Sequence, residues 1–83
     1  MELKYFTASW CAPCKTFGPI VESVTKTFGL DIIKIDIEKN PEQVPEDVKS
    51  VPTIIKYKDG EEISRIIGGR NAVDFSSWVL SSS

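Results

Sequence analysis

The chain carries two cysteines, Cys11 and Cys14, and both lie in the stretch 10–15, which reads Trp-Cys-Ala-Pro-Cys-Lys. Two thiols separated by two residues, where a strand pattern gives way to a helix pattern, are typical of a redox pair. The first sulfur would lie at the helix N-terminus, where unpaired backbone N–H groups and the helix dipole favour a thiolate. Pro13 suits the first helical turn, because its missing N–H costs nothing there. We expect Cys14, one turn further in, to be less exposed than Cys11 and close enough to attack a mixed disulfide formed by Cys11.

A metal site is the alternative interpretation of the same two thiols. The sequence contains no histidine and no third cysteine, so a tetrahedral zinc ion would need a second chain or carboxylates to complete its ligands. An iron–sulfur cluster shared between two subunits would face the same shortage of thiolates. We therefore expect a catalytic dithiol with no metal and no prosthetic group.

Length, charge and hydropathy narrow the class of protein further. The 83 residues predict one domain, 1–83, at the small end for a self-sufficient core. The net charge of −2 argues against a large basic surface for nucleic acid, and no apolar run has the length of a membrane span. Residues 1–5 lack the pattern of a signal peptide. The sequence thus predicts a cytoplasmic monomer, in a compartment where a vicinal dithiol is more often catalytic than structural.

The periodicity of the chain predicts the element order βαβαββα. A helix with one apolar face should follow the first cysteine and extend to about residue 28, because its apolar residues recur at helical spacing. A weak, acidic helix is expected over 41–49, and a last helix should begin near Asn71. Asp59-Gly60 predicts a hairpin turn, and the Ser81-Ser82-Ser83 tail should be frayed. The predicted strands cover 3–8, 31–37, 53–58 and 62–67.

These strands and helices predict an α/β fold with a four-stranded mixed sheet and helices on both faces. The first two strands, joined by a helix, should be parallel with a right-handed crossover. The hairpin should then add two antiparallel strands to the sheet.

The chain resembles the thioredoxin family over residues 3–78, nearly its whole length. The stretch 10–15 matches the active-site block of that family, with alanine where glycine is commonest. Four further positions match in the same order: the helix-kinking Pro19, the lysine beneath the active site at Lys34, the cis-proline loop 51–53, and the glycine beside the substrate groove at Gly68. A lone Cys-x-x-Cys is a weak signal, whereas several matches in the right order are specific.

The resemblance implies the thioredoxin fold and a thiol–disulfide oxidoreductase that reduces protein disulfides. Cys11 would attack the substrate disulfide, and Cys14 would resolve the mixed disulfide. Electrons would come from NADPH through a thioredoxin reductase. The backbone of the cis-proline loop would pair with an extended substrate segment. The residues expected to support or line the site are Tyr5, Trp10, Ala12, Pro13, Lys34, Val51, Pro52, Thr53 and Gly68.

The chain departs from the family in two respects. The N-terminal strand and helix that usually precede this core are not present before residue 3. Tyr5 replaces the buried aspartate that thioredoxins carry six residues before the first cysteine. A tyrosine hydroxyl, with a reference pKa of about 10, is a poor base near neutral pH. We expect Tyr5 to pack in the core with its hydroxyl hydrogen-bonded, and a contact with Lys34 would replace the usual partner.

Other interpretations compete with this one. The short core and the segment Ile67-Gly68-Gly69 followed by Asp74 are also similar to glutaredoxins, and Lys15, Arg70 and Asp74 could contact glutathione. A noncatalytic thioredoxin-fold binding subunit is a third class. Individual residues have structural interpretations too: Lys34 could reach solvent from an edge strand, Gly68-Gly69 could serve only as a turn, and Trp10 could belong to the core.

Overall fold

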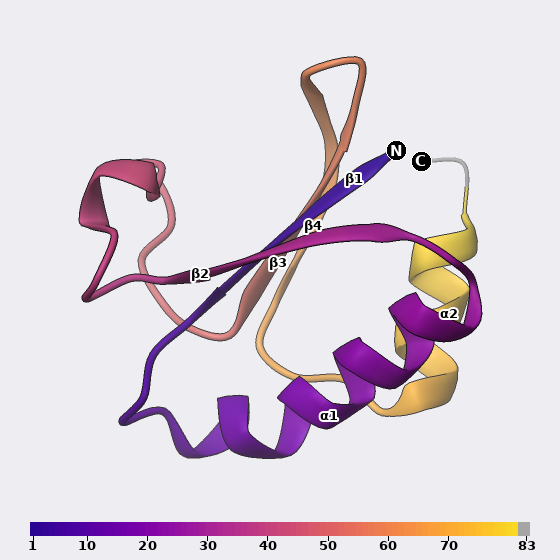
Figure 1. Cartoon of the computed structure of the whole chain (residues 1–83), viewed down its shortest axis with the longest axis horizontal. Helices are drawn as coiled ribbons and strands as arrows, with labels where there is room; N and C mark the ends of the chain where they lie inside the picture. The colour runs from indigo at the N-terminus through magenta and orange to yellow at the C-terminus, as the bar shows by residue number, and fades with distance from the viewer. Residues whose placement is uncertain (82–83) are drawn as a thin grey trace.

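The computed structural model describes residues 1–81, and its elements follow the predicted order with one exception (Figure 1). The strands are β1 (Glu2–Thr7), β2 (Asp31–Asp36), β3 (Thr53–Lys58) and β4 (Glu61–Ile67), and the helices are α1 (Ala12–Thr27) and α2 (Ala72–Leu80). A short 3-10 turn, η1 (Pro41–Gln43), stands where a second helix was expected.

The four strands form one mixed sheet in the order β2-β1-β3-β4. β1 runs parallel to β2 and antiparallel to β3, and β3 and β4 form an antiparallel hairpin. The hairpin turns at Asp59 and Gly60, whose φ angles of 53° and 83° are those that an Asp-Gly turn supplies. The predicted mixed sheet and its hairpin are therefore confirmed.

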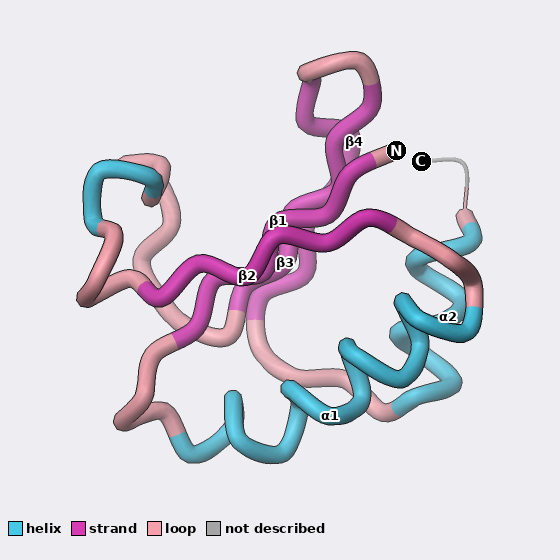
Figure 2. Tube along the Cα trace, in the orientation of Figure 1, coloured by secondary structure: helices cyan, strands magenta, loops and turns pink. Residues whose placement is uncertain are grey.

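Both α-helices pack on the same face of the sheet (Figure 2). Phe17 lies at the centre of this packing, with its ring 5.3 Å from that of Phe75 in α2 and 6.2 Å from that of Tyr5 in β1, both in edge-on geometry. Such aromatic pairs stabilise a core beyond the area that they bury. The buried members of this helix-face core are Leu3, Tyr5, Phe17, Val21, Val24, Ile54, Ile66, Phe75 and Val79.

The opposite face of the sheet is covered by irregular chain, so the prediction of a helix over 41–49, and with it a regular helix on this face, was wrong. Val44 has extended backbone angles, φ −97° and ψ 119°, because the residue before a proline is excluded from the helical region and Pro45 follows it. The 3-10 turn therefore ends at Gln43. The segment still covers the sheet, since Val44, Val48 and Val51 pack against Phe6, Ile35 and Ile55.

The end of α2 is tied to the sheet by a fully buried lysine. Lys56, in β3, donates from Nζ to the backbone carbonyls of Trp78 and Ser81, and its ammonium lies 4.5 Å from the centre of the Trp78 ring. Carbonyls at a helix C-terminus lack partners within the helix, and a cation there also interacts favourably with the helix dipole. The prediction of a frayed tail does not hold at Ser81, whose N–H donates to Trp78; Ser82 and Ser83 lie outside the described residues.

The start of α2 is fixed by Asn71. Its side-chain oxygen accepts a hydrogen bond of 2.8 Å from the backbone N–H of Asp74, which satisfies one of the unpaired donors of the first turn. The predicted start of the last helix is confirmed. Within residues 1–81, no helix combines the length and apolar character needed to cross a membrane.

Candidate active site

The two cysteines lie where β1 ends and α1 begins, and they form a disulfide with their Cα atoms 5.2 Å apart. Cys11 is the N-cap of α1, and its Sγ accepts a hydrogen bond of 3.2 Å from the backbone N–H of Cys14. Pro13 stands in the first turn, where no N–H is needed. A backbone donor aimed at the Cys11 sulfur favours its charged form when the disulfide is reduced.

The two cysteines are buried to nearly the same extent. Cys11 is 3% exposed and Cys14 is 5% exposed, so the expectation that Cys14 is the less exposed of the two is wrong for the disulfide form. The reason is that the bonded sulfurs share one small apolar cluster with Ala8, against which Ile37 and Val51 pack. The difference between the cysteines lies in hydrogen bonding, because the donor from the helix points at Cys11.

The cis-proline loop lies beside the dithiol, as the resemblance implied. The Val51–Pro52 peptide bond is cis, and Val51 packs against the cysteine cluster. Gly68 donates its N–H to the carbonyl of Pro52 at 2.8 Å. Its φ of 88° requires a glycine-like turn at this point. Thr53 begins β3 opposite Ile67, so the loop 51–53 adjoins the end of β4; Val51 and Gly68 are partly exposed on this surface, whereas the side chains of Pro52 and Thr53 are buried.

Trp10 and the first turn of α1 complete this surface. The side chain of Trp10 is 64% exposed, which rules out its interpretation as a core aromatic. Ala12 and Pro13 are exposed next to it. An exposed tryptophan beside a reactive sulfur offers a large apolar contact area to a partner.

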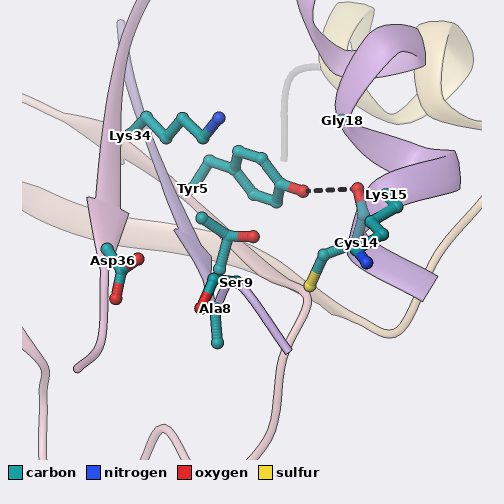
Figure 3. Close-up of a pocket in the computed structure, with 9 residues that line it drawn as sticks. Tyr5, Ala8, Ser9, Cys14, Lys15, Gly18, Lys34 and Asp36 are labelled. Carbon is teal, nitrogen blue, oxygen red and sulfur yellow. Dashed lines mark hydrogen bonds between the residues drawn. The ribbon is translucent and has the colours of Figure 1, made fainter. Parts of the chain in front are cut away.

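Tyr5 lies beneath the dithiol, buried and hydrogen-bonded as expected. Its hydroxyl donates to the backbone carbonyl of Cys14 at 3.4 Å (Figure 3). Burial raises the pKa of Tyr5 above 10, the nearby Glu22 raises it further, and a hydrogen bond with Thr7 opposes this shift. The Tyr5 phenol holds its proton at neutral pH and donates it in this hydrogen bond, so it cannot act as a base there.

Lys34 is the partner of Tyr5 across the β1–β2 ladder, and the two side chains lie near each other in Figure 3. The sequence left open whether these two side chains meet, and the ladder places the two residues side by side on neighbouring strands. Lys34 is exposed on the edge strand β2. Its position therefore also fits the alternative interpretation, in which its side chain only reaches solvent from an edge strand.

A cavity of about 270 Å³ lies between the ends of β1 and β2 and the start of α1. Of the two cysteines, Cys14 lines it. Sequence reasoning missed Thr7, Ser9 and Asp36 in this region. The strand period of two could have found Thr7 and Asp36, because residues 5 and 7 and residues 34 and 36 share one face of the sheet. The lining residues are Tyr5, Thr7, Ala8, Ser9, Cys14, Lys15, Gly18, Lys34 and Asp36.

Comparison with known proteins agrees with this geometry. A dithiol at a helix N-terminus, facing a cis-proline loop on a four-stranded mixed sheet, defines a dithiol redox protein. The family model described as Thioredoxin matches residues 2–81, and the chain belongs to the thioredoxin family. Over 71 residues it is 37% identical to a thioredoxin of Staphylococcus haemolyticus and 35% identical to one of Staphylococcus aureus; each match covers 82% of this chain and 68% of the relative.

Solved thioredoxin structures have the same fold. Thioredoxin 1 from Thermosipho africanus superposes with a TM-score of 0.84 at 29% identity, over 95% of this chain and 90% of that one. The thioredoxin of Fasciola hepatica gives a TM-score of 0.85 at 30% identity, over 94% and 76% of the two chains. The thioredoxin fold predicted from the sequence is confirmed, and the chain is a thiol–disulfide oxidoreductase with the redox pair Cys11 and Cys14. Among residues 1–81, no cluster of three or more His, Cys, Asp or Glu side chains could hold a metal ion.

Proposed function

We propose that the chain reduces disulfides of other proteins, with Cys11 as the attacking sulfur and Cys14 as the resolving sulfur. The Cys11 thiolate attacks one sulfur of the substrate disulfide, and the other substrate sulfur leaves as a thiolate that takes a proton. Cys14 then loses its proton and attacks the Cys11 sulfur, which releases the second substrate thiol and leaves the Cys11–Cys14 disulfide. The hydrogen bond from the Cys14 N–H to the Cys11 sulfur is the observation that supports this order.

The substrate would lie on the surface formed by Trp10, Ala12, the loop 51–53 and Gly68. Trp10 and Ala12 are exposed, and the Gly68 N–H is already bonded to Pro52. Val51 would offer its own N–H and C=O to an extended substrate segment, in the manner of strand addition. Lys34 would act from the opposite side as a cation near Cys14 that favours its thiolate.

We also propose that a thioredoxin reductase using NADPH restores the dithiol, and that the reaction takes place in the cytoplasm. Membership of the thioredoxin family supports this choice, and a reductant of this kind needs a reducing compartment. The glutathione alternative gains little from Arg70. Its Nη1 atom lies within hydrogen-bond distance of three backbone carbonyls of its own turn, so this end of the guanidinium is already engaged.

Trapping of covalent intermediates tests the roles of the two sulfurs. The Cys14→Ser variant should accumulate a mixed disulfide with a protein substrate such as insulin, because nothing resolves it. The Cys11→Ser variant should form none and should have no reductase activity. Non-reducing electrophoresis followed by mass spectrometry identifies the linked cysteine. Trapping by Cys11→Ser and not by Cys14→Ser would reverse the assignment.

A comparison of electron donors tests the reductase proposal. NADPH with a bacterial thioredoxin reductase should give saturable turnover, and glutathione should give slow reduction that does not saturate. Ala12→Trp, which adds bulk to the exposed first turn of α1, should raise the KM for the reductase. Ser23→Trp, exposed in the same helix away from the dithiol, is the matched control. Efficient, saturable turnover with glutathione alone would place the chain with the glutaredoxins in function.

A further inference from the structure

The resolving step needs a place for the Cys14 proton, and Tyr5 cannot accept it. The Tyr5 hydroxyl is a donor to the Cys14 carbonyl. The cavity beside Cys14 has a volume of about 270 Å³, which has room for several water molecules at about 30 Å³ each. A proton leaving the Cys14 sulfur would therefore have water within the cavity as its first acceptor.

Asp36 is the one carboxylate among the residues that line the cavity. It stands at the end of β2, and Figure 3 shows it across the cavity from Cys14. Its Oδ1 atom accepts hydrogen bonds from the backbone N–H groups of Glu38 and Lys39, at 2.9 and 3.2 Å. These two bonds hold Oδ1 in place, and Oδ2 is the oxygen that they leave to accept a proton.

The other charged groups around the cavity are cations or lie outside it. Lys15 lines it from α1 and Lys34 lines it from β2. A cation near a sulfur favours its thiolate, so these two lysines would stabilise the charged form of Cys14. Glu22, in α1, acts on Tyr5 and does not line the cavity.

We propose that Asp36 accepts the proton of Cys14, through water in this cavity, during resolution of the mixed disulfide. The Cys14 S–H bond breaks, its proton passes through water to Asp36 Oδ2, and the Cys14 thiolate attacks the Cys11 sulfur. The Cys11–substrate S–S bond breaks as the Cys11–Cys14 bond forms. The leaving substrate sulfur takes the electron pair and a proton from solvent, and Asp36 then releases the Cys14 proton to solvent. This assignment rests on the proposed role of Cys14 as the resolving sulfur.

The two chemical steps can be separated with 5,5′-dithiobis(2-nitrobenzoate), an aromatic disulfide. Attack by Cys11 releases one coloured thiolate at a rate that depends on reagent concentration. Attack by Cys14 then releases the second in a phase that does not. Stopped-flow absorbance from pH 5.5 to 9 gives both rates for the full chain, which starts in its reduced form.

Asp36→Asn keeps an oxygen at Oδ1 for the two backbone donors and removes the proton acceptor. We expect it to slow the second phase at pH 6–7 by about 100-fold, the low end for loss of a general base, and to leave the first phase unchanged. The deficit should shrink toward pH 9, where hydroxide takes over the role. Asp36→Glu, which retains a carboxylate, should restore most of the rate. Glu38→Gln, two residues along and outside the cavity, is the control and should leave both phases unchanged.

A second phase that is unchanged or faster in Asp36→Asn would overturn the proposal, because a carboxylate that acts only through its charge disfavours the thiolate. Equal slowing of both phases would overturn it as well, since that indicates a structural role. Failure of the underlying function is distinguishable: the unaltered chain would then show no second phase that depends on Cys14.

Discussion

Tyr5 replaces a carboxylate with a ring that belongs to the core. The ring packs edge-on against Phe17, and the hydroxyl donates to the Cys14 carbonyl. Tyr5→Asp, which restores the residue typical of the family, should lower the free energy of unfolding by about 3–5 kcal/mol, because it removes a buried aromatic and buries a carboxylate. It should also shift the thiolate absorbance of the dithiol to higher pH through like-charge repulsion.

Tyr5→Phe is the matched comparison, since it keeps the ring and removes only the hydroxyl. We expect it to cost about 1 kcal/mol, the usual net contribution of one hydrogen bond. Urea unfolding of both variants and absorbance at 240 nm against pH provide the measurements. If Tyr5→Asp were as stable as Tyr5→Phe, the core position assigned to the ring would be wrong.

Lys56 is a buried charge whose partners on the described residues are neutral oxygens and a ring. Lys56→Met fits the same volume but leaves the carbonyls at the end of α2 without this donor. We expect a loss of about 2 kcal/mol in the free energy of unfolding, typical of hydrogen bonds to a charged group. Lys58→Met, exposed in the same strand, should change it by less than about 0.5 kcal/mol. A more stable Lys56→Met protein would mean that desolvation of the ammonium outweighs its hydrogen bonds.

The pH dependence of stability provides a second test of Lys56. Burial lowers the pKa of Lys56 below its usual 10.5. Between the lowered pKa and 10.5 the unfolded chain binds more protons than the folded one, so this group makes stability rise with pH in that window. Tyr5 and Tyr57 have raised pKa values and act in the opposite direction. The contribution of Lys56 is therefore the difference between the unaltered chain and Lys56→Met, measured by urea unfolding from pH 8.5 to 10.5.

At the scale of elements, the strands were predictable because their signals are local. β3 begins and ends at the predicted residues, since β-branched residues fill it and the Asp59-Gly60 turn fixes its end. The segment 41–49 was not predictable in the same way. Its spacing of Val44 and Val48 fits a helix, and those residues do face the sheet. Pro45 decides the backbone instead, because it forces Val44 into an extended conformation.

The part of the active site that could be predicted from the sequence is the part that residue types and their spacing identify. Cys11 and Cys14 are recognised by spacing, and the loop 51–53 by its match to a family. Asp36 was missed although the strand period places it on the same face as Lys34, because one acidic residue at the end of a strand is ordinary in sequence. Its place in the cavity depends on the parallel pairing of β1 with β2, which sets Tyr5 opposite Lys34 and Thr7 opposite Asp36. The sequence predicted that pairing but not the open space beside it.

The two asparagines that precede helical turns form a natural comparison. Asn71 accepts a hydrogen bond from Asp74 at the start of α2, whereas Asn40, before η1, makes no such cap. Asn71→Ala should lower the free energy of unfolding by about 1 kcal/mol, and Asn40→Ala should lower it by much less. Chemical denaturation of both variants tests the difference. Equal effects would mean that the cap of α2 does not contribute to stability.

At the scale of the whole molecule, the two faces of the sheet are held unequally. The helix face has a core of nine buried side chains, and the other face has three, covered by partly buried valines from irregular chain. Segments with few buried contacts open more easily than the core. We expect amide hydrogens of residues 38–50 to exchange with solvent at least tenfold faster than those of β1 and β3. Hydrogen exchange with mass spectrometry or NMR measures this, and equal protection of both faces would contradict it.

The lysine that holds the end of α2 also bears on the timing of folding. Lys56 and its acceptor Ser81 are 25 residues apart in the chain, so during synthesis the strand is made well before the carbonyl that it needs. Until Ser81 has been added, burial of β3 leaves an ammonium short of hydrogen-bond acceptors, which is costly. A growing chain that stops short of Ser81 should therefore remain open and accessible to proteases. We therefore expect the domain to close as a unit only after the last turn of α2 has been made, and limited proteolysis of chains that end before residue 81 measures this.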